Sequence, residues 1–282
     1  MSHNKFHWLL FLWLYIVAPL SSMGQGFDVM TFNIRLDAPA DGINAWDNRK
    51  ADVVNMLKYY SPDLLGMQEV RPNQLDELGK ELSTYAWLGV GRDDGHHKGE
   101  HCPIFYKKER FQLLDSGNFS LSTTPEVFGV KGWDASYNRV ATWAVLLDKQ
   151  TGKKLAFVNT HLDNDGRVAR AEGIKLVLRM MKRYASGLPL VITGDFNSTE
   201  QDVLNILQQD GMVNTRDKAK VVYGPNWSFH DFGRLPVAQR QLLDHVYVSP
   251  TFSVDRYRVM TDKPDEHYLS DHCPVLVRLI LS

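Results

Sequence analysis

Short β-rich runs alternate with segments of helical periodicity along almost the whole chain. The runs cover residues 27–32, 64–67, 102–106, 140–147, 155–159, 190–193, 243–248 and 275–281. Apolar residues recur at helical spacing within residues 53–60, 75–82, 168–184 and 203–207. Because no Ser/Gly/Pro-rich linker or internal repeat separates these elements, the alternation predicts one α/β domain over residues 25–282.

Hydrophobic strands of this kind are buried on one side by a partner sheet and on the other by helices. This burial predicts an α/β sandwich with two central sheets. A doubly wound sheet is the alternative fold. No G-x-G-x-x-G or G-x-x-x-x-G-K-[ST] loop follows any of the runs, which argues against dinucleotide and P-loop chemistry.

The composition supports a large buried core and excludes a strong long-range electric field. Of the 282 residues, 44% are hydrophobic and 23% are charged, which excludes a disordered tail or a fibrous repeat. Lys and Arg together number 32 and Asp and Glu 33, so the formal net charge is −1. A nearly neutral chain does not attract a polyanion over a distance, so any contact with nucleic acid must be local.

The first 24 residues differ from the rest of the chain. Lys5 precedes an apolar run over residues 8–20, and the small residues Ser22 and Gly24 follow it. This run is shorter than the roughly 20 residues of a membrane span, so residues 1–24 are predicted to be a signal peptide. We therefore expect an exported monomer, periplasmic or secreted, with no stable membrane anchor after cleavage.

The chain has two cysteines, Cys102 and Cys273, and each lies in or beside an apolar run. Export would permit one disulfide between them. Two buried free thiols are an equal alternative, so the sequence leaves the pairing open.

Polar side chains stand at the carboxyl ends of the apolar runs, where ligands meet an α/β sheet. These residues are Asn33, Gln68, Glu69, Asn159, His161, Asp195 and Asn197, with Asp244, Asp271 and His272 beside the last two runs. Turn and cap formation explains any one of them. Turns do not require Glu and His in series, however, so the pattern favours a functional site.

The residue types in this series indicate a metal-dependent chemistry. Asn33, Glu69 and Asp271 offer hard oxygen donors without thiolates, a set that suits Mg²⁺ or Mn²⁺ and not Zn²⁺. A phosphate ester is the natural substrate of such a site. His161 and His272 are candidates for proton transfer, and a carboxylate beside either would fix its tautomer.

Six motifs occur in an order that resembles the endonuclease/exonuclease/phosphatase superfamily. They are Thr-Phe-Asn33, Gln-Glu69-Val, Asn-Thr-His161, Gly-Asp195-Phe-Asn197, Asp244-His-Val and Ser-Asp271-His272. The resemblance covers about residues 27–280. It implies a four-layer α/β sandwich with two central mixed β-sheets flanked by helices, and a site at one end of the packed sheets.

The resemblance also implies a role for each matched residue. Glu69 would be the principal metal ligand, with Asn33 holding metal or phosphate and Asp271 near the metal. Asp195 would orient and deprotonate the attacking water, while Asn197 would bind the phosphoryl oxygens. His272, oriented by Asp244, would act as a base or phosphate clamp, and His161 would stabilise the transition state or assist the leaving group.

Three further positions resemble the family less specifically. Glu100 resembles the carboxylate that orients the first catalytic histidine of pancreatic-type deoxyribonucleases, here His161. Arg139 resembles a phosphate-facing arginine. A surface salt bridge is the alternative for both residues. Arg71 resembles an arginine that touches DNA, but the start of a helix beside Pro72 explains it equally well.

The sequences of the loops are compatible with several classes of substrate. Trp133 and Trp227 lie in aromatic-rich loops and are candidates for stacking on a substrate, although such residues also anchor loops by packing inward. Because no basic run accompanies them, the sequence favours a small phosphodiester or phosphomonoester over long duplex DNA. A secreted nuclease acting on DNA or RNA is one alternative function, and a non-catalytic glycan- or lipid-binding module is another.

Overall fold

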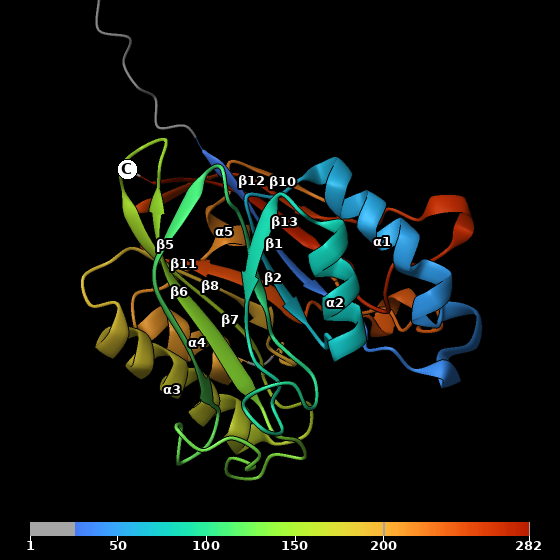
Figure 1. Ribbon diagram of the computed structural model, residues 1–282, viewed down its shortest axis with the longest axis horizontal. Helices are drawn as coiled ribbons and strands as arrows, with labels where there is room; N and C mark the ends of the chain where they lie inside the picture. Colours follow the sequence, from blue (N-terminus) through green and yellow to red (C-terminus); the bar gives the residue numbers. More distant parts are fainter. Residues whose placement is uncertain (1–25, 200, 282) are drawn as a thin grey trace, which may run out of the picture.

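Two mixed β-sheets pack face to face in the computed structural model, which describes residues 26–199 and 201–281 (Figure 1). The predicted signal peptide, residues 1–24, lies outside this range. The first sheet has seven strands in the order β10 (Val221–Tyr223), β12 (Phe252–Val259), β13 (Val275–Leu281), β1 (Phe27–Asn33), β2 (Leu64–Gln68), β4 (Ile104–Lys107) and β3 (Tyr85–Leu88). The second has six, in the order β5 (Phe111–Ser120), β6 (Val140–Asp148), β7 (Lys154–His161), β8 (Leu190–Asp195), β11 (Asp244–Val248) and β9 (Val213–Asn214).

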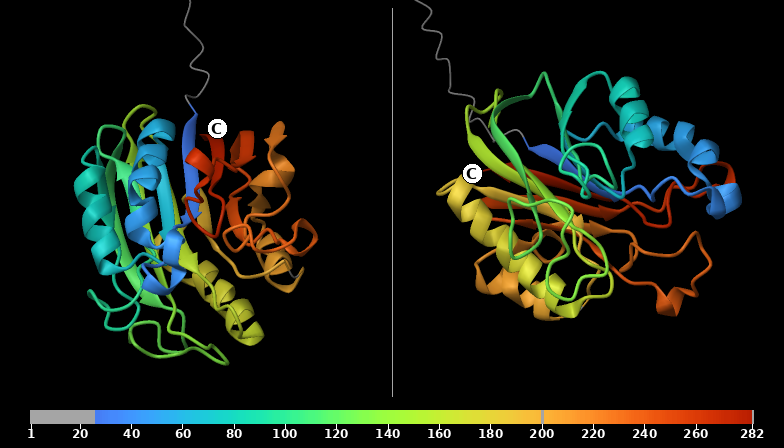
Figure 2. Two further views of the ribbon diagram at one scale, coloured as in Figure 1. Left: turned by 90° about the vertical axis from the view of Figure 1, so that its right-hand side faces the viewer. Right: turned by 60° about the horizontal axis from the view of Figure 1, so that its bottom comes forward.

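Helices cover the outer face of each sheet. The long helices are α1 (Trp46–Tyr60), α2 (Pro72–Glu81), α3 (Arg167–Tyr184) and α4 (Gln201–Gln209). The chain also forms the short helix α5 (Thr215–Lys218) and 3-10 turns at Pro39–Asn44, Val237–Gln239 and Pro264–Glu266. In the right-hand view of Figure 2, α1 and α2 lie on one side of the strands and α3 and α4 on the other. None of the described helices has the length and hydropathy to cross a membrane.

The period-two alternation of strand side chains creates the layers. In β1, Val29 belongs to a cluster between the two sheets, whereas its neighbour Met30 packs in the cluster beneath α1 and α2. In the second sheet, Phe157 faces the space between the sheets and Val158 faces the helices α3 and α4. Three separate clusters therefore hold four layers together, and the predicted four-layer α/β sandwich is confirmed.

A buried polar network joins the two sheets directly beneath the strand ends. Gln68 Nε2 donates hydrogen bonds to Asn159 Oδ1 at 2.7 Å and to Thr31 Oγ1 at 3.0 Å. Thr193 Oγ1 also donates to Asn159 Oδ1, at 3.1 Å. A Cβ on Gly66 would lie 2.4 Å from Thr193 Oγ1, so the sheets approach closely only because this position has no side chain. The network fixes how the strand ends of one sheet lie against those of the other.

The sequence located all four long helices and eight strands, but it missed others. The strand expected at residues 102–106 begins at Ile104, because His101 instead forms isolated bridges with Val70 and Gly91. In β12, which was missed, a register shift between Val254 and Arg256 interrupts the period-two pattern. The strand β5 was missed because much of it is exposed at a sheet edge.

The structure also resolves the cysteine question that the sequence left open. Cys102 and Cys273 are both buried, and no disulfide joins them. Burial raises the pKa of each thiol to about 12. Both behave as small core residues in the part of the chain that the structure describes.

Candidate active site

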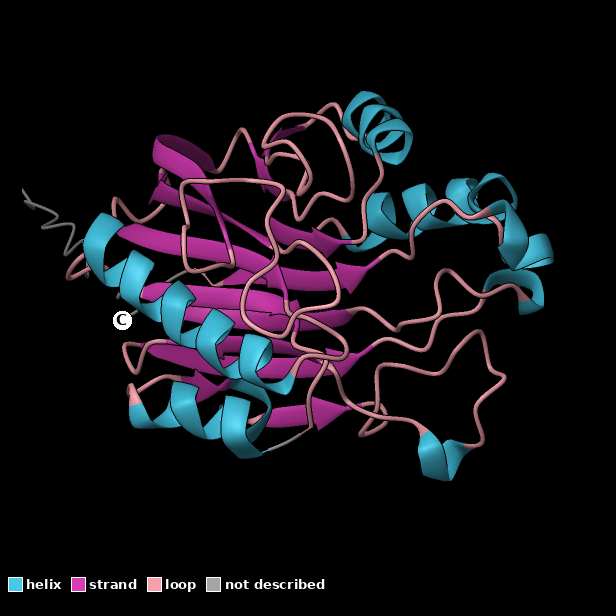
Figure 3. Ribbon diagram, turned by 90° about the horizontal axis from the view of Figure 1, so that it is seen from below, coloured by secondary structure: helices cyan, strands magenta, loops and turns pink. Residues whose placement is uncertain are grey.

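The polar residues at the strand ends converge at one end of the sandwich. Asn33 ends β1 and Glu69 follows β2, and these two strands run parallel. His161 ends β7 and Asp195 ends β8, which are also parallel and neighbours in the second sheet. Figure 3 shows the long loops that gather at this end of the strands. Strand order within each sheet and the packing of the two sheets therefore bring together side chains that are far apart in the sequence.

A cavity of about 640 Å³ opens at this end of the molecule. Most of its lining is charged or ionisable. The acidic residues are Glu69, Glu100, Asp195, Asp231 and Asp271, the cationic residues are Arg35, Arg71, Arg92 and Arg139, and the two histidines are His161 and His272. Asn164, Asn197, Tyr137, Phe229, Leu36 and Leu243 complete the wall. Acidic groups and four guanidinium groups in one cavity suit a cation and an anionic ligand bound together.

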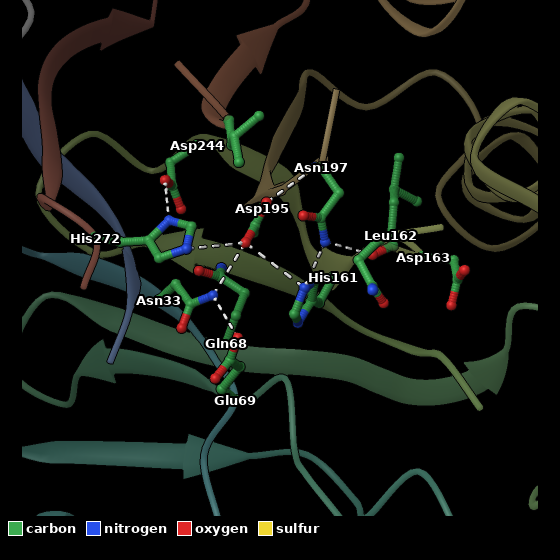
Figure 4. Close-up of polar contacts among 12 residues, drawn as sticks. Asn33, Gln68, Glu69, His161, Leu162, Asp163, Asp195, Asn197, Asp244 and His272 are labelled. Carbon is green, nitrogen blue, oxygen red and sulfur yellow. Dashed lines mark hydrogen bonds and ion pairs between the residues drawn. The ribbon is translucent and has the colours of Figure 1, made fainter. Parts of the chain in front are cut away.

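The Asn33 side chain donates hydrogen bonds to two of the acidic side chains. It is fully buried, and Nδ2 donates hydrogen bonds to Glu69 Oε1 and to Asp195 Oδ2, each at 3.0 Å (Figure 4). Its Oδ1 accepts the backbone N–H of Arg35. Asn33 does not itself line the cavity, so its position is that of a residue that orients Glu69 and Asp195.

Backbone strain is concentrated at this site. Glu69 has φ 62°, Asn197 has φ 47° and Arg35 has φ 59°, all in the left-handed region that residues with a Cβ rarely adopt. The Glu69 carboxylate accepts the backbone N–H of Leu36 as well as the Asn33 amide. Such strain persists only where surrounding contacts enforce it, and it is typical of functional sites.

Asp195 lies between the two histidines. Its Oδ2 is 3.5 Å from His161 Nε2 and 3.7 Å from His272 Nε2, as Figure 4 shows. Burial, followed by the nearby charge of Asp244, raises the pKa of Asp195 to about 7. A carboxyl group with a pKa near neutrality can accept or release a proton during a reaction.

His272 is bound to Asp244 on its other side. His272 Nδ1 and Asp244 Oδ2 are 2.7 Å apart, and Asp244 is fully buried. Burial lowers the pKa of His272, but the carboxylates of Asp244 and Asp195 outweigh it and hold that pKa well above its ordinary value. The ring of Phe229 packs against the imidazole at 4.9 Å. The expected Asp244–His272 pair is therefore present, and its histidine favours the charged form.

His161 has the opposite electrostatic environment. Burial, and then the positive charges of Arg139 and Arg92, hold the pKa of His161 well below its ordinary value. Its Nε2 lies 2.8 Å from Asn197 Nδ2, which also donates to the backbone oxygen of Leu162. The backbone N–H of Asn197 donates to Asp195 Oδ1 at 2.9 Å. The two imidazoles thus favour opposite protonation states, His161 the neutral and His272 the charged form, on either side of one carboxyl group.

Two groups of residues have donor atoms that suit a metal ion. Glu69 and Asp271 both line the cavity. Burial raises the pKa of Asp271, the charge of His272 opposes this effect, and the charge of Glu69 adds to it. These two carboxylates fit a hard divalent cation. In the second group, one ligand atom each from Asp195, Asp244 and His272 lies within 4.8 Å of the others. Both groups lie at the same end of the sandwich.

Glu100 requires a correction. It lines the cavity, but Oε2 accepts a hydrogen bond from Arg92 Nη1 at 2.7 Å, whereas the expectation was that it orients His161. The hydrogen-bond partner of His161 Nε2 is Asn197. Burial is the main cause that raises the pKa of Glu100, and Arg92 opposes it. The salt-bridge alternative accounts for this residue.

The two tryptophans expected to bind substrate also require correction, because neither lines the cavity. Trp133 packs on the core cluster beneath α3 and α4. Trp227 packs on the cluster between the sheets and borders a separate pocket of about 190 Å³. Arg240 lies over its ring at 4.4 Å. Both side chains anchor their loops inward, as the sequence alternative allowed.

Arg139 lines the cavity as expected, and so does Arg71, whose backbone N–H also donates to Gln74 Oε1 at the start of α2. Arg35, Arg92, Asn164 and Asp231 also line the cavity, and none of them was predicted from the sequence. Of these, Arg35 follows Asn33 by two positions, so its closeness to that motif is a local signal. The other three lie in loops whose path no periodicity predicts.

Two solved structures share the fold and part of the sequence of this chain. The solved endonuclease/exonuclease/phosphatase from Bacteroides vulgatus has a TM-score of 0.88 and 39% identity, covering 92% of this chain and 100% of that one. A mannosyl-6-phosphatase from Bacteroides thetaiotaomicron has a TM-score of 0.85 and 34% identity, covering 90% and 100%.

A curated relative extends the comparison to eukaryotes. The CCR4-Not complex 3'-5'-exoribonuclease subunit Ccr4 of Debaryomyces hansenii is 25% identical over 83% of this chain, which spans 35% of the length of that relative. The family model for the Endonuclease/Exonuclease/phosphatase family matches residues 30–272. Since that match covers most of the described residues and ends on His272, the chain belongs to the endonuclease/exonuclease/phosphatase family of phosphoester hydrolases.

Proposed function

We propose that this protein is an exported, Mg²⁺- or Mn²⁺-dependent hydrolase of small phosphate esters. The observation that carries the proposal is the position of Asp195 between the imidazoles of His161 and His272 in the charged cavity. A water held by a carboxyl group and two imidazoles of different charge is poised for attack on phosphorus.

The metal would be held by Glu69 and Asp271, with Asn33 orienting Glu69 through its amide. When bound, the ion neutralises charge on the phosphoryl oxygens and orients the ester. The group formed by Asp195, Asp244 and His272 is the weaker candidate. Its histidine shares a 2.7 Å hydrogen bond with Asp244 and has a raised pKa, and a protonated imidazole has no lone pair to give to a metal.

The remaining residues would divide the proton transfers and the binding of phosphate. Asp195 would take the proton of the attacking water, for which its pKa of about 7 is suitable. His272 in its charged form would donate a hydrogen bond to a phosphoryl oxygen, and Asp244 would fix its orientation. Asn197, whose amide donates to a backbone oxygen and contacts His161 Nε2, would hold neutral His161 towards the leaving group. The leaving oxygen would take up the proton removed from the water.

A sugar phosphate is the substrate class that we favour. The cavity of about 640 Å³ has the size of a small-molecule site. The formal charge of −1 supplies no general attraction for long nucleic acids. The name of the Bacteroides thetaiotaomicron relative, a mannosyl-6-phosphatase at 34% identity over 90% of this chain, supports a phosphomonoester carried by a sugar.

A secreted nuclease is the second candidate. The exoribonuclease name of the Debaryomyces hansenii relative favours it, and that relative shares 25% identity with this chain. The non-catalytic binding module is disfavoured, because the acids and both imidazoles of the proposed mechanism are present and converge. Export is also part of the proposal, and the signal-peptide pattern of residues 1–24 supports it. The proposal further includes a monomeric state.

A substrate panel tests the proposal. Mannose 6-phosphate, p-nitrophenyl phosphate, bis-p-nitrophenyl phosphate, an RNA oligonucleotide and plasmid DNA would each be incubated with Mg²⁺, Mn²⁺ or EDTA. We expect metal-dependent release of phosphate from mannose 6-phosphate, and loss of that activity in Asp195→Asn. Preferential cleavage of RNA or DNA would favour the nuclease, and no turnover of any ester would favour the binding module.

Cell fractionation and light scattering test the remaining parts. We expect the protein outside the cytoplasm with an amino terminus near residue 25, and a scattering mass equal to one chain. Recovery of the intact chain from the cytoplasm would contradict export.

A further inference from the structure

The wall of the cavity beside His161 contains two arginines that share one aromatic ring. The guanidinium carbon of Arg92 lies 5.3 Å from the centre of the Tyr137 ring, and that of Arg139 lies 5.6 Å from it. All three side chains line the cavity. One ring therefore contacts both guanidinium groups, and each is attracted to it.

Each guanidinium group is fixed on one side by protein acceptors. Arg92 Nη1 donates to Glu100 Oε2 at 2.7 Å. Arg139 Nε donates to Asp163 Oδ2 at 3.3 Å, and its Nη2 donates to Asn164 Oδ1 at 2.8 Å. Their orientations are thus set before any ligand arrives, which reduces the entropy lost on binding.

Each guanidinium group also keeps a nitrogen without a protein acceptor. Among the described residues, Arg139 Nη1 and Arg92 Nε are buried and have no hydrogen-bond partner. The Arg139 side chain is only 5% exposed. A buried N–H without an acceptor is unfavourable, and both side chains line the cavity, which an oxygen-rich ligand can enter.

The loop that carries Tyr137 and Arg139 is held rigidly by one buried carboxylate. Asp163 is 1% exposed and accepts the backbone N–H groups of Ser136 and Tyr137 as well as that of Gly166. The Asp163 carboxylate therefore binds three backbone N–H groups besides the Arg139 guanidinium group, which fixes the loop and the arginine together.

The arginine pair is distinct from the cation that lies beside the metal candidate Asp271. Arg35 is the cation beside Asp271, with Nη1 3.8 Å from Oδ2, whereas Arg92 and Arg139 act on His161. If His161 faces the leaving group, as proposed above, these two arginines border the part of the cavity that the leaving group occupies.

We propose that Arg92 and Arg139 form a second anion subsite, which binds a phosphate or carboxylate group on the leaving-group portion of the substrate. This inference rests on the proposed function, because it takes the scissile phosphate to lie at Asp195. Two planar guanidinium groups with free N–H bonds match the oxygens of a phosphate or a carboxylate. The preferred substrates are then phosphate esters that carry a second negative group, rather than neutral sugar phosphates.

Three related esters separate the possible ligands. Glucose 6-phosphate has no second charge, 6-phosphogluconate adds a carboxylate, and glucose 1,6-bisphosphate adds a phosphate. We expect kcat/KM in Mg²⁺ to be at least tenfold higher for one or both doubly anionic esters than for glucose 6-phosphate. The dissociation constants, measured by calorimetry with Asp195→Asn and Mg²⁺, are expected to follow the same order.

Variants of Arg92 test the assignment to this pair. In Arg92→Gln the tenfold preference is expected to fall to about twofold or less. The double variant Arg92→Gln/Glu100→Gln removes the pair without leaving Glu100 unpaired, and it should lose the preference equally. Arg256, an exposed arginine on β12 whose side chain is 65% exposed, provides the matched control, and Arg256→Gln should keep the preference.

The outcomes separate the subsite from the proposed function. Hydrolysis of all three esters at similar kcat/KM, or a preference that survives in both Arg92 variants, would overturn the subsite and leave the proposed function supported. Selective binding without any hydrolysis would overturn the proposed function and support the subsite. If the Arg92 variants fail to fold, the preference of the unaltered enzyme among the three esters still tests whether a second anion subsite exists.

Discussion

His272 Nδ1 lies 2.7 Å from Asp244 Oδ2, and both side chains are buried. The hydrogen bond fixes the orientation of the imidazole and, together with Asp195, outweighs the effect of burial on the pKa of His272. A buried carboxylate in this position stabilises the charged ring, on which the proposed hydrogen bond to a phosphoryl oxygen depends.

Replacing Asp244 with Asn should therefore reduce turnover. Asn keeps the shape of the side chain but removes its charge, so the pKa of His272 should fall. We expect kcat on p-nitrophenyl phosphate with Mg²⁺ to decrease by about 100-fold or more. The matched control is Asp255→Asn, at a partly exposed aspartate on β12, which should change kcat by less than about twofold. A kcat within threefold of the original in Asp244→Asn would contradict the assigned role.

Removing the metal, or its principal ligand, should abolish activity. Treatment with EDTA is expected to stop turnover, and added Mg²⁺ or Mn²⁺ to restore it. Glu69→Gln keeps the hydrogen-bonding shape but removes the charge, so Mg²⁺ affinity measured by calorimetry should fall by about 100-fold or more. The exposed Glu126 provides the control, since Glu126→Gln should bind Mg²⁺ normally. Unchanged Mg²⁺ affinity in Glu69→Gln would show that other residues bind the metal.

His230 should make stability depend on pH. Burial, followed by the charges of His272 and Arg240, lowers its pKa to about 4. Because the folded pKa lies below the unfolded value of about 6.5, the unfolded chain binds a proton more readily between these values. The stabilisation that comes from burying neutral His230 is therefore fully present above pH 6.5. As the pH falls towards 4, the free energy of unfolding declines by up to about 3 kcal/mol.

The variant His230→Asn isolates this contribution. The Asn oxygen can still accept the backbone N–H of Gly233, which now donates to His230 Nδ1 at 3.1 Å. Urea unfolding at pH 8 and pH 5 should show a smaller loss of stability in the variant than in the original chain. An identical loss in both proteins would show that other groups carry the pH dependence.

Asp163 should be essential for the loop that carries Tyr137 and Arg139. Asp163→Asn removes the negative charge beside buried Arg139 and weakens the bonds from Ser136 and Tyr137. We expect a loss of about 3 kcal/mol in the free energy of unfolding, measured by urea denaturation. The neighbouring Asp165 is exposed, so Asp165→Asn is the control and should lose less than about 1 kcal/mol. Equal stability of the two variants would contradict the role of Asp163.

The two thiols should be unreactive in the folded protein. Burial raises the pKa of Cys102 and of Cys273 to about 12, so almost no thiolate forms at neutral pH. A thiol reagent should label neither cysteine in native buffer and both in denaturant, without prior reduction. Labelling in denaturant only after reduction would reveal a disulfide.

The layers, and most of the residues of the candidate site, could be predicted from the sequence because these depend on local patterns. Alternating apolar residues in β1 and helical spacing in α3 require burial on defined faces, whatever the rest of the chain does. Asn33 and Asp195 could be predicted as candidates because each closes an apolar strand, the position where ligands meet an α/β sheet. The bulged strand β12 escaped, because one shifted register is enough to remove its period.

Only the tertiary structure decided what each loop side chain touches. Asn33 and Asp195 are 162 positions apart and share a 3.0 Å hydrogen bond, which no local pattern contains. Glu100 was free in sequence to pair with His161 or with a cation, and packing of the loops placed it against Arg92. Trp133 turned towards the core, because loop side chains follow the contacts that bury most apolar surface rather than a period in the sequence. The chain alone thus determined which residues could react, and folding determined their partners, because hydrogen bonds between distant loops exist only once the sheets have packed.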